Sequence, residues 1–185
     1  MDPLIVIIAL IAVFVLWAVA LYNRLVKKKN MVKEGWSGID VQLKRRANLI
    51  PNLIETVKGY MEHESDVLKS VTELRTRSMG DGKPGEQGAT QGLLGAALGK
   101  LFAVAENYPD LKADKNFQEL HEALEKVEEQ IQLARRYYNG AVRDLNILIE
   151  SFPSNLVANQ FKFVQAEFFE LEDAADRAVP EISFD

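Results

Sequence analysis

Few residues in this sequence have the types and spacing that metal binding or acid–base catalysis requires. The 185 residues include two histidines, His63 and His121, and no cysteine. A di-iron helical bundle needs Glu-x-x-His on two helices, and neither histidine here has a glutamate three positions before it. The lack of cysteine excludes a disulfide framework, a zinc–thiolate site and a cysteine nucleophile. We therefore expect no catalytic residue, no cofactor and no metal, and a protein that is not an enzyme.

Two further patterns could carry chemistry, and each has a simpler explanation. Gly80-x-Gly82-x-x-Gly85 matches a dinucleotide-binding fingerprint, which requires a preceding strand and a helix that opens at the third glycine. Neither is predicted, because residues 80–92 contain five glycines and one proline and favour a flexible loop. The second pattern is an acidic run that we interpret as the solvated face of an amphipathic helix: Glu122, Glu125, Glu128 and Glu129.

Two charged residues stand at positions where a helical packing pattern requires apolar ones. Arg46 and Glu64 fall on the apolar stripe of a helix predicted over residues 22–79, about 27 Å apart if that helix is straight. They cannot pair with each other within one chain, so each needs a partner from another helix, or solvent at a kink near Pro51. Two alternatives remain open: a polar contact that fixes the packing of the bundle, or a contact with another subunit or protein. The candidate interaction site consists of Asp40, Lys44, Arg45, Arg46 and Glu64.

Helical periodicity dominates the sequence beyond residue 22 and predicts an all-α fold. Apolar residues alternate spacings of three and four from Trp36 to Leu74 and again from Phe117 to Phe152, as in helices that pack on one another. We expect Asp114 to cap the second long helix and Pro51 to kink the first or, less favoured, to break it. The predicted helices span residues 22–79, 93–107, 114–152 and 155–178. They form an antiparallel bundle of two long and two shorter helices over residues 23–178, followed by a tail at 179–185.

An uninterrupted apolar run, residues 4–21, precedes the first bundle helix. Eighteen helical residues rise about 27 Å, close to the hydrocarbon thickness of a bilayer. The alternative is a cleaved signal peptide, which needs a basic segment ahead of the run, and only Met1, Asp2 and Pro3 precede it. We therefore predict that residues 1–22 form a retained transmembrane anchor whose helix continues into the bundle.

Basic residues cluster directly behind this run, although the whole chain has a net charge of −5. Residues 24–46 have a net charge of +6 and residues 47–185 of −10. This excess predicts a single-pass protein of the cytoplasmic membrane, with the N-terminus outside and the helical body in the cytoplasm. The acidic body argues against nucleic acid, whereas the basic residues suit anionic lipid headgroups. The predicted headgroup-binding residues, here named the basic collar, are Arg24, Lys27, Lys28, Lys29 and Lys33.

Short motifs along nearly the whole chain resemble those of one family. They are YNRLV at 22–26, WSGIDVQLKRR at 36–46, LIPNL at 49–53, VKGY at 57–60, HE at 63–64, E-x-YPDLKA at 106–113, Arg135, YN at 138–139 and FPSN at 152–155. On these residues the sequence resembles the LemA family. The resemblance implies a bacterial or archaeal single-pass membrane protein with a helical bundle, and it implies no established enzymatic activity. Some members resemble a magnetosome-membrane protein and others are encoded beside a membrane metalloprotease, which points to membrane organisation or quality control.

We therefore expect a membrane-anchored, non-enzymatic helical scaffold that forms a homo-oligomer or binds a membrane partner, such as a membrane protease. The alternative is a module that binds anionic lipid, or shapes the membrane, through its basic collar. A hydrolase or metalloenzyme is a third alternative, for which the sequence offers no assembled site. The scaffold hypothesis depends on whether Arg46, Glu64 and an outer stripe of Ile54, Met61 and Leu68 are covered within one chain.

Overall fold

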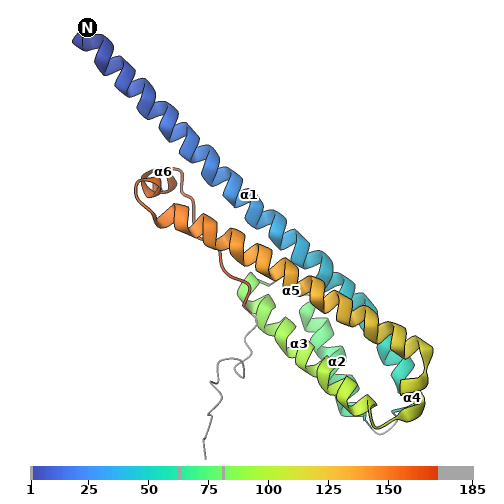
Figure 1. The fold of residues 1–185 in the computed structure, drawn as a ribbon. Coiled ribbons are helices and arrows are strands. Elements are labelled where there is room, and N and C mark those ends of the chain that lie inside the picture. The colour runs from blue at the N-terminus through green and yellow to red at the C-terminus, as the bar shows by residue number, and fades with distance from the viewer. Residues whose placement is uncertain (1, 62–63, 81, 171–185) are drawn as a thin grey trace, which may run out of the picture. The chain divides into compact units, whose positions relative to one another are not determined.

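The computed structural model of the chain describes residues 2–61, 64–80 and 82–170. These residues form helices and no strand, which confirms the all-α class (Figure 1). The helices are α1 (Pro3–Lys58), α2 (Ser65–Ser78), α3 (Pro84–Ala105), α4 (Pro109–Ala113), α5 (Lys115–Glu150) and α6 (Ser154–Gln160). The chain divides into two compact units, each described by itself below. Unit 1 contains residues 1–40 and 133–168, and unit 2 contains residues 41–132 and 169–185.

α1 begins ahead of the apolar run and continues far beyond it as one helix. Its most apolar stretch of 18 residues has a mean hydropathy of 3.3, and none of that stretch is buried by the rest of the described chain. By length and composition it can cross a bilayer. Pro51 lies inside α1, so the less favoured prediction of a helix break there is wrong.

α1 ends at Lys58, so the prediction of one helix over residues 22–79 is wrong. Gly59 follows, and the next two backbone N–H groups both donate to the carbonyl of Val57 as the chain turns. α2 starts after this turn and packs its apolar residues into the same core as the end of α1. The spacing of three and four continues across the turn, which is why periodicity alone does not reveal it.

Most of the glycine-rich region at 80–92 is helical, contrary to the predicted flexible loop. α3 begins at Pro84, with Glu86 in its first turn, which is a typical helix start. The link from α2 is therefore confined to residues 79–83. Gly88 serves close packing, because a Cβ atom there would collide with the backbone of Glu170.

α5 agrees closely with the helix predicted over residues 114–152. Asp114 caps it as expected, since its Oδ1 accepts a hydrogen bond of 2.9 Å from the backbone N–H of Phe117. The hydroxyl of Tyr60 donates to Oδ2 of the same carboxylate at 3.2 Å. One aspartate therefore starts α5 and holds the end of α1 beside it.

The last helix is much shorter than the one predicted over residues 155–178. α6 ends in a Schellman turn, in which the N–H of Phe163 donates to the carbonyl of Ala158 and the N–H of Lys162 to that of Asn159. Lys162 has a φ of 55°, the left-handed conformation that such a turn requires. The prediction is wrong over residues 161–170, and residues 171–178 with the predicted tail lie outside the described residues.

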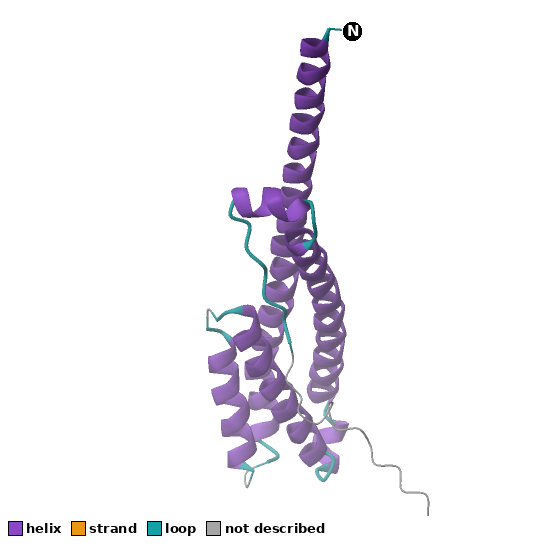
Figure 2. Cartoon of the chain, turned by 90° about the vertical axis from the view of Figure 1, so that its left-hand side faces the viewer, coloured by secondary structure: helices purple, strands orange, loops and turns teal. Residues whose placement is uncertain are grey.

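In unit 1, α1 and α5 run antiparallel and α6 lies crosswise to α1 (Figure 2). The order of the contacts fixes the direction, because Lys28 meets Asp144 whereas Trp36 meets Tyr138. The core of this unit is small and joins all three helices through these residues: Leu25, Leu145, Ile149, Val157 and Ala158.

Two side chains of α5 hold the irregular segment that follows α6. The amide of Asn146 donates to the carbonyl of Ala166 at 3.0 Å and accepts its N–H at 2.9 Å. The hydroxyl of Tyr138 donates to the carbonyl of Glu167 at 2.8 Å. These bonds supply backbone groups with partners that a helix would otherwise provide.

Unit 2 packs parts of α1, α2, α3 and α5 around the larger core. α2 and α3 form an antiparallel hairpin, and α4 connects α3 to α5 (Figures 1 and 2). Ile54, Met61 and Leu68 are buried in this core. The outer stripe is therefore covered within one chain.

The two glycines of α1 in unit 1 make a matched test of this packing. A Cβ atom at Gly35 would lie 3.0 Å from Cα of Tyr138 and 3.1 Å from Cδ1 of Tyr137, whereas one at Gly38 meets no described atom within 4 Å. We expect Gly35→Ala to lower the free energy of unfolding by about 1–3 kcal/mol through overpacking. Gly38→Ala should raise it by about 0.5–1 kcal/mol through helix propensity.

Urea unfolding of the full-length protein in a mild detergent, followed by circular dichroism, measures both variants. A Gly35→Ala protein as stable as Gly38→Ala would contradict the close approach of α1 and α5.

Candidate functional site

The basic collar lies on α1 directly behind the apolar run, and its members are not equivalent. Four of the five are exposed, whereas Lys28 is partly buried. The Nζ of Lys28 lies 2.8 Å from Oδ2 of Asp144 on α5. The Nζ of Lys29 lies over the ring of Phe163, 5.7 Å from its centroid. The collar thus combines exposed cations with one that forms an ion pair with α5.

The ion pair of Lys28 persists at neutral pH. The hydrogen bond from Lys28 holds the pKa of the Asp144 carboxyl below its ordinary value, against a smaller opposing effect of burial. The contact is present above the ordinary pKa of an aspartate and is lost as the pH falls through the lowered one. Lys28 and Asp144 are therefore paired at neutral pH.

The residues of the candidate interaction site do not form one cluster. Lys44 and Arg45 are exposed on α1, Asp40 is partly buried, and Arg46 is buried. Glu64 lies in the turn before α2 and is partly exposed, so its predicted place on the stripe of a continuous helix is wrong. Of the two charged stripe positions, Arg46 alone is buried.

Arg46 binds partners from two other helices of unit 2, as its buried position requires. Its side chain is 3% exposed, and one guanidinium nitrogen lies 2.7 Å from Oε2 of Glu128 on α5. The other donates to the backbone carbonyl of Gln91 on α3 at 3.2 Å and to the side-chain oxygen of the same residue. The prediction that Arg46 needs a partner from another helix is confirmed.

The cluster extends to the end of α2 through Gln91. The Gln91 amide donates to the carbonyl of Ser78 at 3.3 Å, and Nε of Arg75 on α2 donates to the carbonyl of Ala47 at 2.7 Å. A side chain at Gly95 would reach the guanidinium of Arg46. Four helices of unit 2, α1, α2, α3 and α5, thus meet around one buried cation.

The electrostatics of Arg46 favour a structural role. Burial lowers the pKa of its guanidinium, and the adjacent carboxylate of Glu128 opposes that shift. Arginine nevertheless stays charged in proteins, so the carboxylate is required to balance a cation removed from water. The cluster therefore positions helices, and the carboxylate of Glu128 in it is partly exposed.

Sequence reasoning missed both partners of Arg46. Gln91 falls in the region predicted to be a loop, although Pro84 and Glu86 indicate a helix start. Glu128 belongs to the acidic run that was interpreted as solvated. The other three acidic residues of that run are exposed, and Glu128 is the exception.

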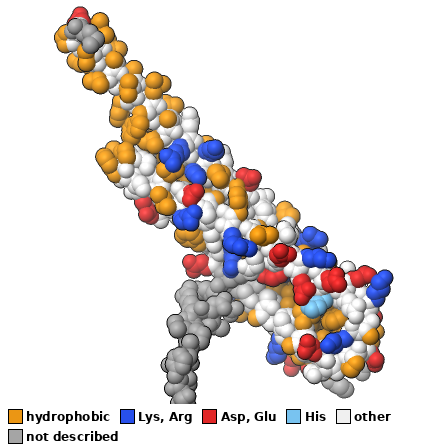
Figure 3. All heavy atoms as spheres, viewed as in Figure 1, with side chains coloured by type: hydrophobic (Ala, Val, Ile, Leu, Met, Phe, Trp, Pro, Cys, Tyr) orange, Lys and Arg blue, Asp and Glu red, His pale blue; other side chains and the backbone are white. Residues whose placement is uncertain are grey.

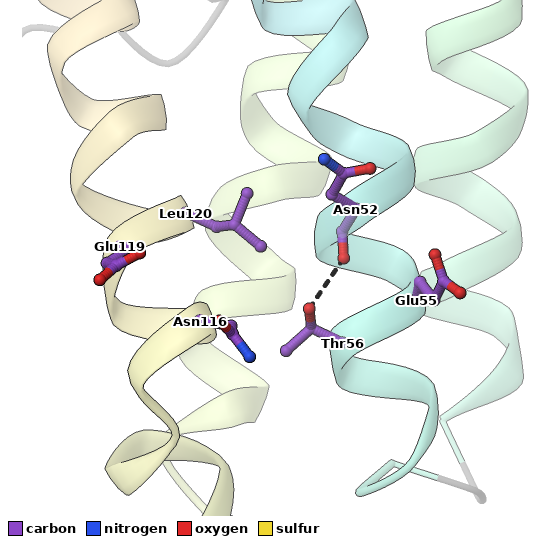
Figure 4. Close-up of a pocket in the computed structure, with 6 residues that line it drawn as sticks. All are labelled: Asn52, Glu55, Thr56, Asn116, Glu119 and Leu120. Atoms are coloured by element: carbon purple, nitrogen blue, oxygen red, sulfur yellow. Dashed lines mark hydrogen bonds between the residues drawn. The ribbon is translucent and has the colours of Figure 1, made fainter.

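A cleft of about 510 Å³ lies between α1 and α5 in unit 2 (Figure 4). Asn52, Thr56, Asn116 and Leu120 border it, and the hydroxyl of Thr56 donates to the carbonyl of Asn52 at 2.9 Å. The carboxylates of the two remaining lining residues, Glu55 and Glu119, lie on opposite outer sides and do not converge (Figure 4). This cleft lacks a pair of acid and base groups that could act on one substrate.

His121 packs against aromatic rings. Its ring centroid is 4.2 Å from that of Phe102 and 6.2 Å from that of Phe117, beside a hollow of about 390 Å³. Its Nε2 lies 3.7 Å from Oε1 of Glu125. In the part of the chain that the structure describes, no three His, Cys, Asp or Glu side chains are placed to hold a metal ion. His63 lies outside that part.

The unequal burial of the Arg46–Glu128 pair predicts unequal effects of substitution. The Arg46 side chain is 3% exposed and that of Glu128 is 43% exposed. Glu128→Leu leaves a buried cation without its carboxylate, and we expect a loss of about 3 kcal/mol in the free energy of unfolding. Arg46→Met leaves a carboxylate that water already reaches, so a loss of about 1 kcal/mol is expected.

The double variant Arg46→Met/Glu128→Leu removes both charges and should be more stable than Glu128→Leu alone. Urea unfolding in mild detergent gives all three values. Additive losses in the double variant would show that the two side chains do not interact.

Comparisons with known proteins point to one family. Residues 35–184 match the model of the LemA family. Magnetosome proteins MamQ 1 and MamQ 2 of Paramagnetospirillum magneticum are each 29% identical to this chain, over 85% of it and 68% of their own length. Protein LemA of Metamycoplasma hominis is 25% identical, over 88% of this chain and 75% of its own length. Since the family match covers most of the residues, including the WSGIDVQLKRR motif, this chain belongs to the LemA family and is a membrane-associated protein of that family.

Proposed function

We propose that this chain is a non-catalytic membrane scaffold that assembles with further copies, or with another membrane protein, through its membrane-embedded part. The supporting observation is the exposed apolar surface of α1, because the core of unit 2 is closed. Arg46, Ile54, Met61 and Leu68 are all covered by the same chain, so the packing stripe of the helical body offers no surface to a partner. Among the described residues, 13 of the 26 large apolar side chains that remain exposed lie on residues 4–19 of α1.

The placement in the cell follows from the charges beside the span. The exposed cations of the collar favour a body on the cytoplasmic side and an N-terminus outside the cytoplasmic membrane. The names of the magnetosome relatives support a role in membrane organisation. For a role in quality control, a membrane protease is the candidate partner.

Cross-linking within the span tests the assembly directly. The sequence has no cysteine, so one cysteine at a time can be placed at residues 9–16 without background. If copies pack span against span, oxidation in native membranes should give dimers at positions that recur every three or four residues. Ser70→Cys on the exposed side of α2 is the control for random collisions.

Dimers no more abundant at any span position than at residue 70 would exclude assembly of copies through the span. Products of a different mass would indicate another membrane protein as the partner.

A second candidate function is recognition of anionic lipid, and the four exposed cations of the collar favour it. Each basic residue near the surface contributes about 1 kcal/mol to the attraction. We expect Lys27→Gln to reduce the preference of the reconstituted protein for spin-labelled anionic over zwitterionic lipid by about this amount. The double variant Lys28→Gln/Asp144→Asn removes two charges that already face each other, so its preference should be unchanged. Equal preferences in all three proteins, at low and high salt, would argue against lipid recognition by the collar.

A further inference from the structure

Apolar side chains are exposed around α6, far along the sequence from the span. Phe152 is 79% exposed and Val164 is 78% exposed, and Leu156 and Phe161 between them are exposed as well. We name residues 152–164 the α6 segment. Figure 3 shows apolar side chains continuing from the N-terminal part of α1 onto the neighbouring surface, where Figure 1 places α6. Several large apolar side chains gathered in this way indicate an interaction surface.

The α6 segment lies at the level where the apolar run of α1 ends. The ring of Phe161 is 4.7 Å from that of Tyr22, centroid to centroid, and the ring of Phe163 is 5.9 Å from it. Tyr22 directly follows the last residue of the run at 4–21. The two phenylalanines therefore lie within about one helical turn of the boundary between acyl chains and headgroups.

The orientation of α6 suits a membrane surface. α6 lies crosswise to α1 (Figure 2), so it runs along the plane of a bilayer that α1 crosses. Val157 and Ala158 face the core of unit 1, where they pack with Leu25. Leu156 remains exposed on α6 itself, with Phe152 and Phe161 at its flanks.

The charge of the α6 segment also suits lipid. Lys162 is its one charged residue, and it contains no acid. Lys162 is exposed, and its left-handed conformation places it between two phenylalanines in the Schellman turn. A long basic side chain in such a position can extend to headgroup phosphates while its aromatic neighbours lie deeper, toward the acyl chains. Lys29 of the collar lies over the ring of Phe163, which follows Lys162 in the sequence.

We propose that the α6 segment is a second membrane contact, which lies in the lipid interface of the leaflet where α1 emerges. Its ligand is the headgroup and upper acyl region of phospholipid. Continuity with the span, orientation along the bilayer plane and the absence of acidic residues favour lipid over a second copy of the chain. The proposal rests on the membrane anchorage of α1 in the proposed function.

Two leucines make a matched test, because both are exposed on unit 1 at different distances from the span. Leu156 in α6 is 59% exposed and Leu133 in α5 is 45% exposed. Leu133 lies beyond the contact of Trp36 with Tyr138, which is about 21 Å along α1 from Tyr22. Each is replaced by cysteine in the full chain, which has no other cysteine. Val13→Cys reports on the span.

The three proteins, labelled with an environment-sensitive fluorophore, are reconstituted into phosphatidylcholine–phosphatidylglycerol vesicles. Quenching by brominated lipids, with bromine near the headgroup for residues 133 and 156 and near the end of the acyl chain for residue 13, is compared with quenching by aqueous iodide. We expect the ratio of lipid to iodide quenching at residue 156 to exceed that at residue 133 by at least about twofold. Phe152→Cys should behave like Leu156→Cys.

Equal ratios at residues 156 and 133, with lipid quenching intact at residue 13, would overturn the interfacial contact and leave the anchor in place. Protection of residue 156 from both quenchers would also overturn it, and would indicate that a second copy of the chain covers this surface. Loss of lipid quenching at residue 13 would refute the anchor, and the α6 proposal with it.

Discussion

The physical constraint on which this structure depends is the exclusion of residues 4–21 from water. An apolar helix of this length has its backbone groups satisfied internally and its side chains matched to lipid, so a bilayer is its stable environment. Because α1 continues beyond the run to Lys58, the same helix supplies the collar, a wall of unit 1 and a wall of unit 2. The membrane-proximal groups are therefore placed by helix geometry, at 1.5 Å per residue from the end of the span.

Those parts of the fold that depend on local pattern could be predicted from the sequence. The apolar run, the long α5 and its cap at Asp114 follow from composition, periodicity and capping chemistry. The turn after Lys58 could not be derived from periodicity, because the apolar spacing continues through it. A helix over residues 93–107 was predicted and agrees with the second part of α3, whereas the first part, residues 84–92, was missed for a different reason. The glycines of residues 80–92 suggest flexibility, whereas Gly88 lets the backbone of Glu170 approach the helix.

For the candidate sites too, the sequence indicates which residue needs a partner but not which residue that partner is. A charge on an apolar stripe signals a buried partner, and Arg46 has one. The identity of that partner depends on which helices meet, so neither Gln91 nor Glu128 could be inferred from its own neighbourhood. Lys28 is a similar case, since nothing local distinguishes it from Lys27, and the contact with Asp144 arises only when α5 packs on α1.

The burial pattern gives the two units different tasks. Unit 2 surrounds the buried Arg46 with helices and covers the apolar stripe at Ile54, Met61 and Leu68, which makes it a body that is closed along that stripe. Unit 1 has a small core and leaves its aromatic and basic side chains exposed beside the end of the span. Unit 2 therefore needs no large apolar contact with a partner. In unit 1, exposed phenylalanines beside lysines are unfavourable in water and favourable at a lipid interface. The exposed side chains of unit 1 are therefore best accommodated at a membrane surface, and the closed core of unit 2 needs no such contact.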